Sequence, residues 1–480
     1  MEKGYKKHSE RKLWIACVMF LFTLVGGVST FAQDSIAKID TVGALQDSMM
    51  VATTEVVEAV ETVASPTLDS GNTAWIIVAT VLVMLMTIPG LALFYGGLVR
   101  QKNVLSIIMQ CLLCVGVISI LWVVFGYSFV FGSGFAESGN ILGNVIGGFD
   151  KIMLNGITSD SLSAGNIPEI LFVLFQCMFA VITPALIAGA FAERIKFSGF
   201  LLFTVLWVVF TYIPMAHWVW GGGWLQKMGA IDFAGGTVVH INAGISALVM
   251  ALMLGRRKDY KVGSPITPHN ITFVFMGTAF LWLGWFGFNA GSGLAADGIA
   301  ANAFLVTHIA TCVSAMTWMI IDWFHYKKPT TIGVCTGAVA GLVAITPAAG
   351  TVDVTGSIFI GLFSSLICYV MVAIIKPRLK YDDALDAFGV HGIGGIVGSV
   401  LTGVFATQAI SGEGGVQGSL YGDWNQLWIQ IIATVASIIF SGVMTYIIFQ
   451  VVDKLVGLRV DKRVEEEGLD VYEHGEAAYN

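Results

Sequence analysis

The sequence predicts an all-α polytopic membrane protein with about eleven transmembrane helices, and three observations support this fold class. Hydrophobic residues make up 56% of the 480-residue chain and charged residues only 12%, whereas soluble domains carry about 25% charged residues. Apolar runs of about 20 residues, the length that crosses a bilayer, recur from residue 73 onward. Basic residues are concentrated in alternate loops, as expected of membrane-spanning chains. No basic cluster indicates nucleic-acid binding.

The N-terminal region is predicted to be removed during export. Basic residues between Lys6 and Lys12 precede an apolar run, Leu13 to Val28, and a cleavage pattern follows at Thr30-Phe31-Ala32. Residues 1–32 therefore have the pattern of a signal peptide; a retained additional helix is the alternative. Residues 33–72 are acidic and rich in Ser, Thr and Ala, which is typical of a weakly structured linker. We expect this linker to be extracytoplasmic.

The apolar runs divide the rest of the chain into a transmembrane domain, 73–453, and a short tail, 454–480. The eighth run is the shortest of them. The predicted spans are 73–98, 104–131, 168–191, 199–221, 235–255, 270–291, 299–324, 331–347, 354–375, 387–408 and 425–452.

Charge in the loops gives the predicted orientation. One set of alternate loops contains only Lys151 and Lys227 as basic residues. Because basic residues concentrate on the cytoplasmic side, we expect the mature N-terminus outside and the C-terminus in the cytoplasm, which requires an odd number of spans. The basic residues assigned to the cytoplasmic loops and tail are Arg100, Lys102, Arg194, Lys196, Arg256, Arg257, Lys258, Lys261, Lys327, Lys328, Lys376, Arg378, Lys380, Lys454, Arg459, Lys462 and Arg463.

A short motif occurs twice in the transmembrane domain. Val239-His240-x-x-x-Gly244-Ile245 in the fifth span is repeated as Val390-His391-x-x-x-Gly395-Ile396 in the tenth, and an acid, Asp232 or Asp386, precedes each copy. Copies that lie five spans apart run in opposite directions through the membrane. This predicts a 5+5 inverted repeat plus one helix, with the functional site where the repeats meet. Chance recurrence of so short a motif is the alternative.

His240 and His391 are the main candidates for chemistry. Ionisable residues inside membrane helices are rare and usually line pathways, so a matched pair favours function over two separately hydrogen-bonded side chains. A neutral imidazole offers one donor and one acceptor, which suits binding of a small polar solute or relay of a proton. Coordination of a haem by both histidines is the alternative. We predict no enzymatic activity, no cofactor and no metal.

Aromatic residues gather near the predicted outer ends of the spans. Phe175 and Phe179 lie in the outer half of the third span, Trp220 ends the fourth, and Phe288 and Ser292 end the sixth. The alternative is the aromatic belt found at membrane interfaces. Around one pore mouth, however, ring faces and a hydroxyl suit recruitment of a cation.

The energetics limit what such a mouth can do. A desolvated cation–π contact contributes about 2 kcal/mol, whereas a charge at the bilayer centre costs at least about 2.5–3.5 kcal/mol. The mouth therefore recruits a cation without carrying its charge through an apolar pore, unless the cation releases a proton on entry. Asp232, at the start of the fifth span, either caps that helix or shapes the mouth, and Asp386 has the same two interpretations.

Several longer motifs, in order, resemble the ammonium transporter family (Amt/Mep/Rhesus), and most closely its bacterial Amt members. The resemblance runs from about Trp75 to the end of the chain. The motifs are Pro89-Gly90-x-Ala92-Leu93-Phe94-Tyr95-Gly96-Gly97, Ala192-Glu193-Arg194, Ala216-His217-Trp218-Val219-Trp220-Gly221-Gly222-Gly223, Asp232-Phe233-Ala234-Gly235-Gly236 up to His240-Ile241-Asn242, Gly284-Trp285-Phe286-Gly287-Phe288-Asn289-Ala290-Gly291-Ser292 and Asp386-x-Phe388-Gly389-Val390-His391-Gly392.

The resemblance implies a homotrimer in the inner (plasma) membrane, with one narrow pore in each subunit. It implies that ammonium binds outside and is deprotonated, that ammonia crosses the pore, and that the proton follows by a separate relay, so that uptake is electrogenic. The implied residues are Phe175, Phe179, Trp220, Ser292 and Asp232 for the substrate, Phe179 with Phe288 for a gate, and His240 with His391 for the pore and proton relay.

The tail also resembles Amt members, where a PII-type nitrogen signalling protein can bind the cytoplasmic exit. Two other functions remain open within this family. One is an ammonium sensor, although the 28 residues after Val452 (480 − 452) leave little room for a signalling domain. The other is a Rhesus-like channel for neutral ammonia. The acidic linker and His308 match no family feature.

Overall fold

The computed structural model describes residues 67–261 and 267–479, which all belong to one compact unit, Pro66–Asn480. The predicted signal peptide and most of the predicted linker lie outside the described residues. Within them the regular structure is mainly helical, and isolated β-bridges join Leu162 to Pro168 and Ile195 to Arg459.

Ten helical segments of the described chain are long and apolar enough to cross a membrane. The remaining predicted span, 331–347, the eighth in order, corresponds to a helix of 15 residues, Thr331–Ile345, which is apolar but shorter than the ten long segments. The ten long segments are Ser70–Leu98, Gln101–Glu137, Glu169–Phe191, Phe197–Met228, Gly236–Leu254, Ile271–Gly291, Gly298–Tyr326, Val354–Leu379, Phe388–Phe405 and Trp424–Leu455.

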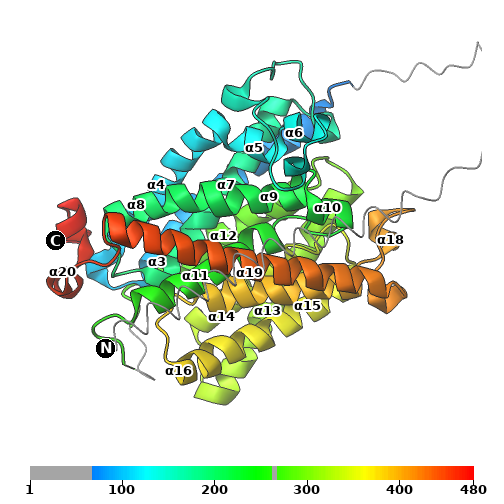
Figure 1. The fold of residues 1–480 in the computed structure, drawn as a ribbon. Helices are drawn as coiled ribbons and strands as arrows, with labels where there is room; N and C mark the ends of the chain where they lie inside the picture. Colours follow the sequence, from blue (N-terminus) through cyan, green and yellow to red (C-terminus); the bar gives the residue numbers. More distant parts are fainter. Residues whose placement is uncertain (1–66, 262–266, 480) are drawn as a thin grey trace, which may run out of the picture. The chain divides into compact units, whose positions relative to one another are not determined.

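Most of these segments are composed of shorter helical elements, and Figure 1 shows the long ones lying alongside one another. The α-helices are α2 Ser70–Leu85, α3 Ala92–Leu98, α4 Val104–Leu121, α5 Tyr127–Phe131, α6 Gly134–Glu137, α7 Glu169–Phe191, α8 Phe197–Trp207, α9 Ile213–Trp220, α10 Trp224–Met228, α11 Asn242–Leu254, α12 Ile271–Gly291, α13 Gly298–Tyr326, α14 Thr331–Ile345, α15 Val354–Tyr369, α16 Lys376–Leu379, α17 Ile393–Phe405, α18 Gln408–Ser411, α19 Trp424–Leu455 and α20 Lys462–Glu467.

Wider π-type turns interrupt the long segments. They are η1 Met86–Leu91, η3 Trp122–Gly126, η7 Val208–Tyr212, η8 Gly236–Ile241, η9 Val370–Ile375 and η10 Phe388–Gly392, with η12 Asp470–His474 in the tail. Single-turn 3-10 elements are η2 Gln101–Asn103, η4 Ile141–Asn144, η5 Ile152–Leu154, η6 Ala164–Asn166 and η11 Ser419–Tyr421. Turns of the π type are frequent at functional sites, and η8 and η10 contain His240 and His391.

Side-chain caps explain where several helices begin. Asp69, Asn270, Asp297, Thr330 and Asp353 each accept a hydrogen bond from the backbone N–H three residues later, at the starts of α2, α12, α13, α14 and α15. Such caps satisfy donors that the first turn of a helix leaves unpaired.

The tail supplies the caps of two other helices. The Asp470 carboxylate accepts from the Leu105 and Ser106 N–H groups of α4, at 3.0 and 2.8 Å, and Glu473 accepts from the Phe197 N–H of α8 at 2.9 Å. Figure 1 shows α20 at the end of the bundle opposite α10 and α18. We call these two ends the tail end and the far end. The C-terminal tail therefore packs against one end of the helical bundle, the end that carries the starts of α4 and α8.

Candidate functional site

The structure brings His240 and His391 into direct contact. Their Nδ1 atoms are 3.3 Å apart, and the two rings are nearly parallel, with centroids at 5.3 Å and an interplanar angle of 16°. Both side chains are buried, at 1% and 4% exposure. We call these two residues the histidine pair. The sequence predicted that they lie together but not that they share a hydrogen bond.

This contact determines what the histidine pair offers to a solute. One Nδ1 must donate and the other accept, so the donating ring has an unprotonated Nε2 and the accepting ring has a protonated Nε2. The histidine pair therefore presents one acceptor and one donor away from the shared bond. The Nε2 atom of His240 is buried and has no hydrogen-bond partner within the described part of the chain.

A narrow cavity lies against the histidine pair. It offers about 10 Å³ to the centre of a water-sized molecule, close to the smallest volume that holds one such molecule. Its other lining side chains are apolar apart from the indole N–H of Trp285, which is donated to the Thr346 hydroxyl at 2.8 Å. Among the lining side chains, a polar solute in this cavity therefore has the two imidazoles as hydrogen-bonding partners. The lining residues are Met86, Leu91, Phe94, Ile182, Leu186, Val239, His240, Leu281, Trp285, Phe288, Val339 and His391.

Glycine allows the two helical segments that carry the histidines to approach each other. A Cβ atom on Gly244 would lie 2.1 Å from the backbone nitrogen of Gly392, and one on Gly395 would lie 2.9 Å from the carbonyl oxygen of Gly236. No side chain larger than hydrogen fits at the first of these contacts. The glycines of the repeated motif thus bring the backbones, and with them the imidazoles, together.

Four aromatic rings extend from the histidine pair toward the far end. Phe288 lies 6.1 Å from the His240 ring and stacks on Phe179, with centroids 4.3 Å apart and an angle of 27°. Phe179 in turn contacts Phe175 at 5.1 Å and Trp220 at 5.8 Å, both edge to face. We call Phe175, Phe179, Trp220 and Phe288 the aromatic cluster. The predicted aromatic residues therefore lie together and are not scattered as a membrane belt would be.

Ser292 lies one helical turn beyond Phe288. Its hydroxyl donates to the Phe288 carbonyl oxygen at 2.8 Å, and the residue is partly exposed. The hydroxyl proton is thereby used within the helix, so what Ser292 offers to a solute is oxygen lone pairs, as a cation requires.

Asp232 acts as a cap, and its main chain also contacts the aromatic cluster. Its carboxylate accepts from the N–H groups of Gly235, Gly236, Thr237 and Val238 and from the Thr237 hydroxyl. Its carbonyl oxygen accepts from the Trp220 indole N–H at 2.8 Å. Burial raises the pKa of Asp232, although these hydrogen bonds act in the opposite direction. Both interpretations of Asp232 thus have structural support.

The second acid of the repeated motif differs from the expectation. Asp386 does not cap η10; it pairs with Lys376 at 2.5 Å. Asp383 is the cap, because its carboxylate accepts from the Ala387 and Phe388 N–H groups at 3.1 and 2.8 Å. Burial raises the pKa of Asp383 to about 6, against the lowering effect of Lys376. The signal was available in the sequence, since Asp232 and Asp383 each precede their histidine by eight residues.

The histidine pair does not fit the haem alternative. Two axial histidines hold the iron between them, but these two nearly parallel rings touch each other directly through Nδ1, with the two atoms 3.3 Å apart. His308, the other histidine noted within a span, is exposed on α13, and its Nε2 lies 3.6 Å from the Cys312 Sγ atom. It does not line the cavity.

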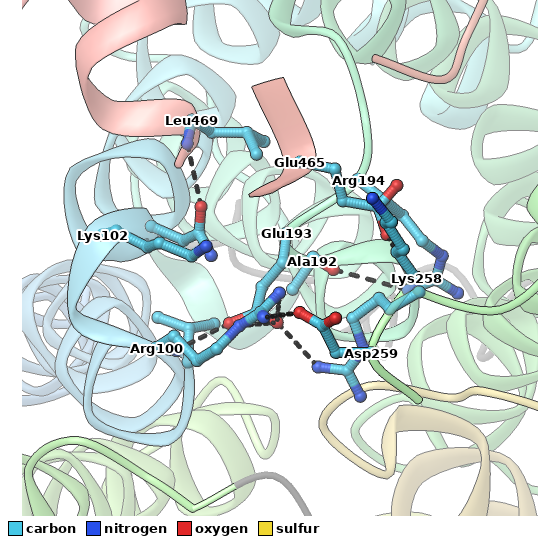
Figure 2. Close-up of polar contacts among 12 residues, drawn as sticks. Arg100, Lys102, Ala192, Glu193, Arg194, Lys258, Asp259, Glu465 and Leu469 are labelled. Atoms are coloured by element: carbon cyan, nitrogen blue, oxygen red, sulfur yellow. Dashed lines mark hydrogen bonds and ion pairs between the residues drawn. The ribbon is translucent and has the colours of Figure 1, made fainter. Parts of the chain in front are cut away.

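A buried ionic cluster at the tail end joins several loops. The Arg257 guanidinium contacts Glu193 at 2.9 Å and Asp382 at 2.7 Å, and Arg100 contacts Glu193 at 2.9 Å. Figure 2 shows Arg100, Glu193 and Asp259 pointing toward one another, with Glu465 of the tail nearby. From the sequence, Glu193 was recognised only as part of a family motif. Its ion pairs could not be predicted, because pairing between distant loops leaves no local pattern.

The charges in this cluster are mutually compensated. Burial alone would raise the carboxyl pKa of Glu193, but Arg257 and Arg100 outweigh it and lower that pKa. The pKa of Asp382 is likewise lowered, because hydrogen bonds and charge from Arg257 outweigh burial. Arg257 also donates its backbone N–H to Asp382 at 2.8 Å. The segment Asp382–Asp383 therefore lies between the ionic cluster and the helix that carries His391.

The fold and the site define a polytopic membrane protein whose core encloses a narrow apolar cavity beside a buried histidine pair. Residues 74–479 match the model of the Ammonium Transporter Family. The chain belongs to this family. It is a multi-pass protein of the cell membrane.

Curated relatives and solved structures agree with this assignment. The chain is 51% identical to an ammonium transporter of Aquifex aeolicus, over 86% of this chain and 94% of the relative. It is 46% identical to an ammonium transporter of Bacillus subtilis, over 86% and 99%. The crystal structure of Candida albicans Mep2 superposes with a TM-score of 0.76 at 36% identity, covering 83% of this chain and 88% of that one. A structure described as a sensor Amt protein matches at 30% identity and a TM-score of 0.76.

Proposed function

We propose that this chain is an ammonium transporter in which the aromatic cluster with Ser292 recruits ammonium, the cation loses a proton there, and ammonia crosses the apolar cavity beside the histidine pair. The observation that carries the proposal is continuity: Trp220, Phe179, Phe288, His240 and His391 follow one another at contact distance. The proton follows by a relay through the imidazoles, so that uptake is electrogenic. The chain is a transporter and not an enzyme.

The stacked rings of Phe179 and Phe288 support the role of a gate. Their centroids are 4.3 Å apart, so a solute passing from Trp220 to the histidine pair must separate them. Deprotonation in front of this gate avoids the cost of at least about 2.5–3.5 kcal/mol for a charge at the bilayer centre. Potassium has no proton to release, and the same cost excludes it.

The arrangement in the membrane is part of the proposal. It comprises eleven spans in a 5+5 inverted repeat plus one, with Thr331–Ile345 as the short eighth span, the mature N-terminus outside and the C-terminus in the cytoplasm. The far end is then the outer side. We further propose the division into signal peptide 1–32, acidic linker 33–72, transmembrane domain 73–453 and cytoplasmic regulatory tail 454–480, a homotrimer, and a PII-type partner at the tail end.

Transient current in proteoliposomes tests this function. An ammonium pulse should give an inward positive current, and an equal potassium pulse should give none. Rapid internal alkalinisation without current would instead identify a Rhesus-like channel for neutral ammonia. Absence of both signals would point to an ammonium sensor.

Replacing Trp220 should weaken recruitment. In Trp220→Leu the cation–π contact, worth up to about 2 kcal/mol, is lost together with the bond to the Asp232 carbonyl oxygen. We expect the half-saturating ammonium concentration to rise by up to about 25-fold, with discrimination against potassium reduced. Current measured over a series of ammonium concentrations checks this. The control is Trp428→Leu, at an exposed position of α19; equal affinity and selectivity in Trp220→Leu and the control would contradict the assigned role.

A further inference from the structure

We infer that Gln430, on the last long helix, is a positioning residue for the aromatic cluster: its side-chain amide holds the segment that places Asp232 and Trp220. This inference rests on the proposed function for its transport consequences. Gln430 lies on α19 and is fully buried at 0% exposure. Its hydrogen bonds go to Ile231, Gln426 and Ser399, which belong neither to the histidine pair nor to the aromatic cluster.

The amide of Gln430 pairs with both backbone groups of Ile231. Its Oε1 atom accepts from the Ile231 N–H at 2.7 Å, and its Nε2 atom donates to the Ile231 carbonyl oxygen at 2.8 Å. A buried backbone N–H or C=O without a partner is costly, and here one side chain satisfies both. The Gln430 amide therefore satisfies both backbone groups of Ile231, as the backbone of a neighbouring strand would in a β-sheet.

Ile231 immediately precedes Asp232, so its position is transmitted along the chain. The Asp232 carboxylate caps η8, the turn that carries His240, and the Asp232 carbonyl oxygen accepts the Trp220 indole N–H at 2.8 Å. One residue beyond Asp232, the Phe233 N–H donates to Pro347 at 3.2 Å. The segment that determines where the Trp220 ring lies is thus held on one side by Gln430.

Gln430 also connects this segment to the helix that follows His391. Its Nε2 atom donates to the Ser399 carbonyl oxygen of α17 at 3.2 Å. The close packing that this requires depends on Gly403, where a Cβ atom would lie 2.8 Å from the Cα of Leu427. One turn earlier on α19, Gln426 donates to the Gly229 carbonyl oxygen at 3.1 Å. Helix α19 therefore holds the 229–232 segment through two glutamines, and Gln430 also joins it to α17.

This arrangement predicts a specific kind of defect. Methionine has nearly the shape of glutamine but no hydrogen-bonding amide, so Gln430→Met leaves the Ile231 N–H and C=O groups and the Ser399 carbonyl oxygen without this partner. The segment bears directly on Trp220 and reaches the cavity lining only through the Asp232 cap of η8, so the main effect should be on ammonium recruitment. The half-saturating ammonium concentration should rise about five- to tenfold, which corresponds to a loss at Trp220 equal to one of the three hydrogen bonds that Gln430 makes to backbone groups. The maximal current should change less than about twofold.

The matched control is Thr445→Val on the same helix. Thr445 is also fully buried, and its hydroxyl donates to the Ser246 hydroxyl at 2.7 Å and accepts from the Trp207 indole at 3.1 Å. It lies nearer the tail end and does not contact the 229–232 segment. A purely structural role of Gln430 predicts that both variants lose stability and maximal current in the same way and leave the half-saturating ammonium concentration unchanged.

The experiment combines transport with hydrogen–deuterium exchange of the full chain in detergent. We expect Gln430→Met, and not Thr445→Val, to raise both the half-saturating concentration and the amide exchange of residues 229–240. Equal exchange and equal half-saturation in the two variants would overturn the inference. Should Gln430→Met fail to fold, the same two measurements on Gln426→Met test the inference. The expected result is a rise of about twofold in the half-saturating ammonium concentration. A wild-type chain without ammonium current would refute the proposed function, while the exchange data would still decide the positioning role.

Discussion

We expect the double substitution His240→Ala with His391→Ala to abolish selective ammonium transport. Among the side chains that line the apolar cavity, the two imidazoles are the hydrogen-bonding groups available to a solute, because the indole N–H of Trp285 is donated to Thr346. Each imidazole has one ring nitrogen outside the bond that the two rings share. Loss of a hydrogen bond to a buried polar group costs about 1–3 kcal/mol. Two such losses amount to about 2–6 kcal/mol, or a decrease in flux of roughly 30-fold or more. Transient current after ammonium and potassium pulses measures it.

The single substitutions should each cause most of this loss. Either alanine leaves the remaining Nδ1 atom buried without the partner that it has at 3.3 Å, so the two effects are coupled and not additive. The control is His308→Ala, which removes an imidazole from an exposed position of α13 that does not line the cavity. Selective flux in the double variant equal to that of the His308 control would exclude the histidine pair from the pathway.

The course of the spans could be predicted from the sequence because hydrophobic length is a local property. The predicted span 270–291 corresponds to α12, Ile271–Gly291, and 354–375 corresponds to the segment Val354–Leu379. The ends were less well predicted, since they depend on caps from distant residues. The start of α4 is an example, because Asp470, more than 360 residues away, supplies its cap.

Part of the candidate site could be predicted because some of its residues stand out within their own apolar runs. His240 and His391 stood out because imidazoles are rare in apolar runs, and the aromatic residues because they end neighbouring spans. The 3.3 Å contact between the rings was not predictable, since it depends on the close approach of Gly244 to Gly392. Asp383 was overlooked because Asp386 lies in the more conspicuous motif.

Residues that act through the backbone of another segment left no signal at all. Gln430 binds Ile231 across 199 positions of sequence, and a glutamine in an apolar run has no pattern that identifies its partner. Arg257 was predicted only as one of several cytoplasmic charges, whereas in the structure it is 6% exposed and lies between two carboxylates. Charge counts predict the side of the membrane but not which charges are buried.

The second large effect should come from that arginine. Arg257→Met removes the ion-pair partner of Asp382 and one of the two partners of Glu193, whose side chains are both 0% exposed. Breaking a buried ion pair by removing one partner costs about 3–5 kcal/mol. We therefore expect a lower free energy of unfolding by about this amount and a lower yield of folded protein. Denaturation in detergent measures it, with Arg378→Met as the control at an exposed position of α16; equal stability of the two variants would contradict the role of the cluster.

The dependence on pH provides a second readout of the same substitution. In the wild type the pKa values of Glu193 and Asp382 are lowered, so the stability that the pairs contribute is fully present above the ordinary carboxyl pKa of about 4 and is lost as the pH falls through the lowered values. Without the Arg257 side chain, Asp382 loses most of the hydrogen bonding and charge that outweigh its burial, so its pKa should rise, whereas Glu193 keeps Arg100. The variant should then gain stability relative to the wild type as the pH falls from 7 toward 5, because the change that comes from Asp383 is common to both proteins. Parallel pH profiles for the two proteins would show that the carboxylates do not depend on Arg257.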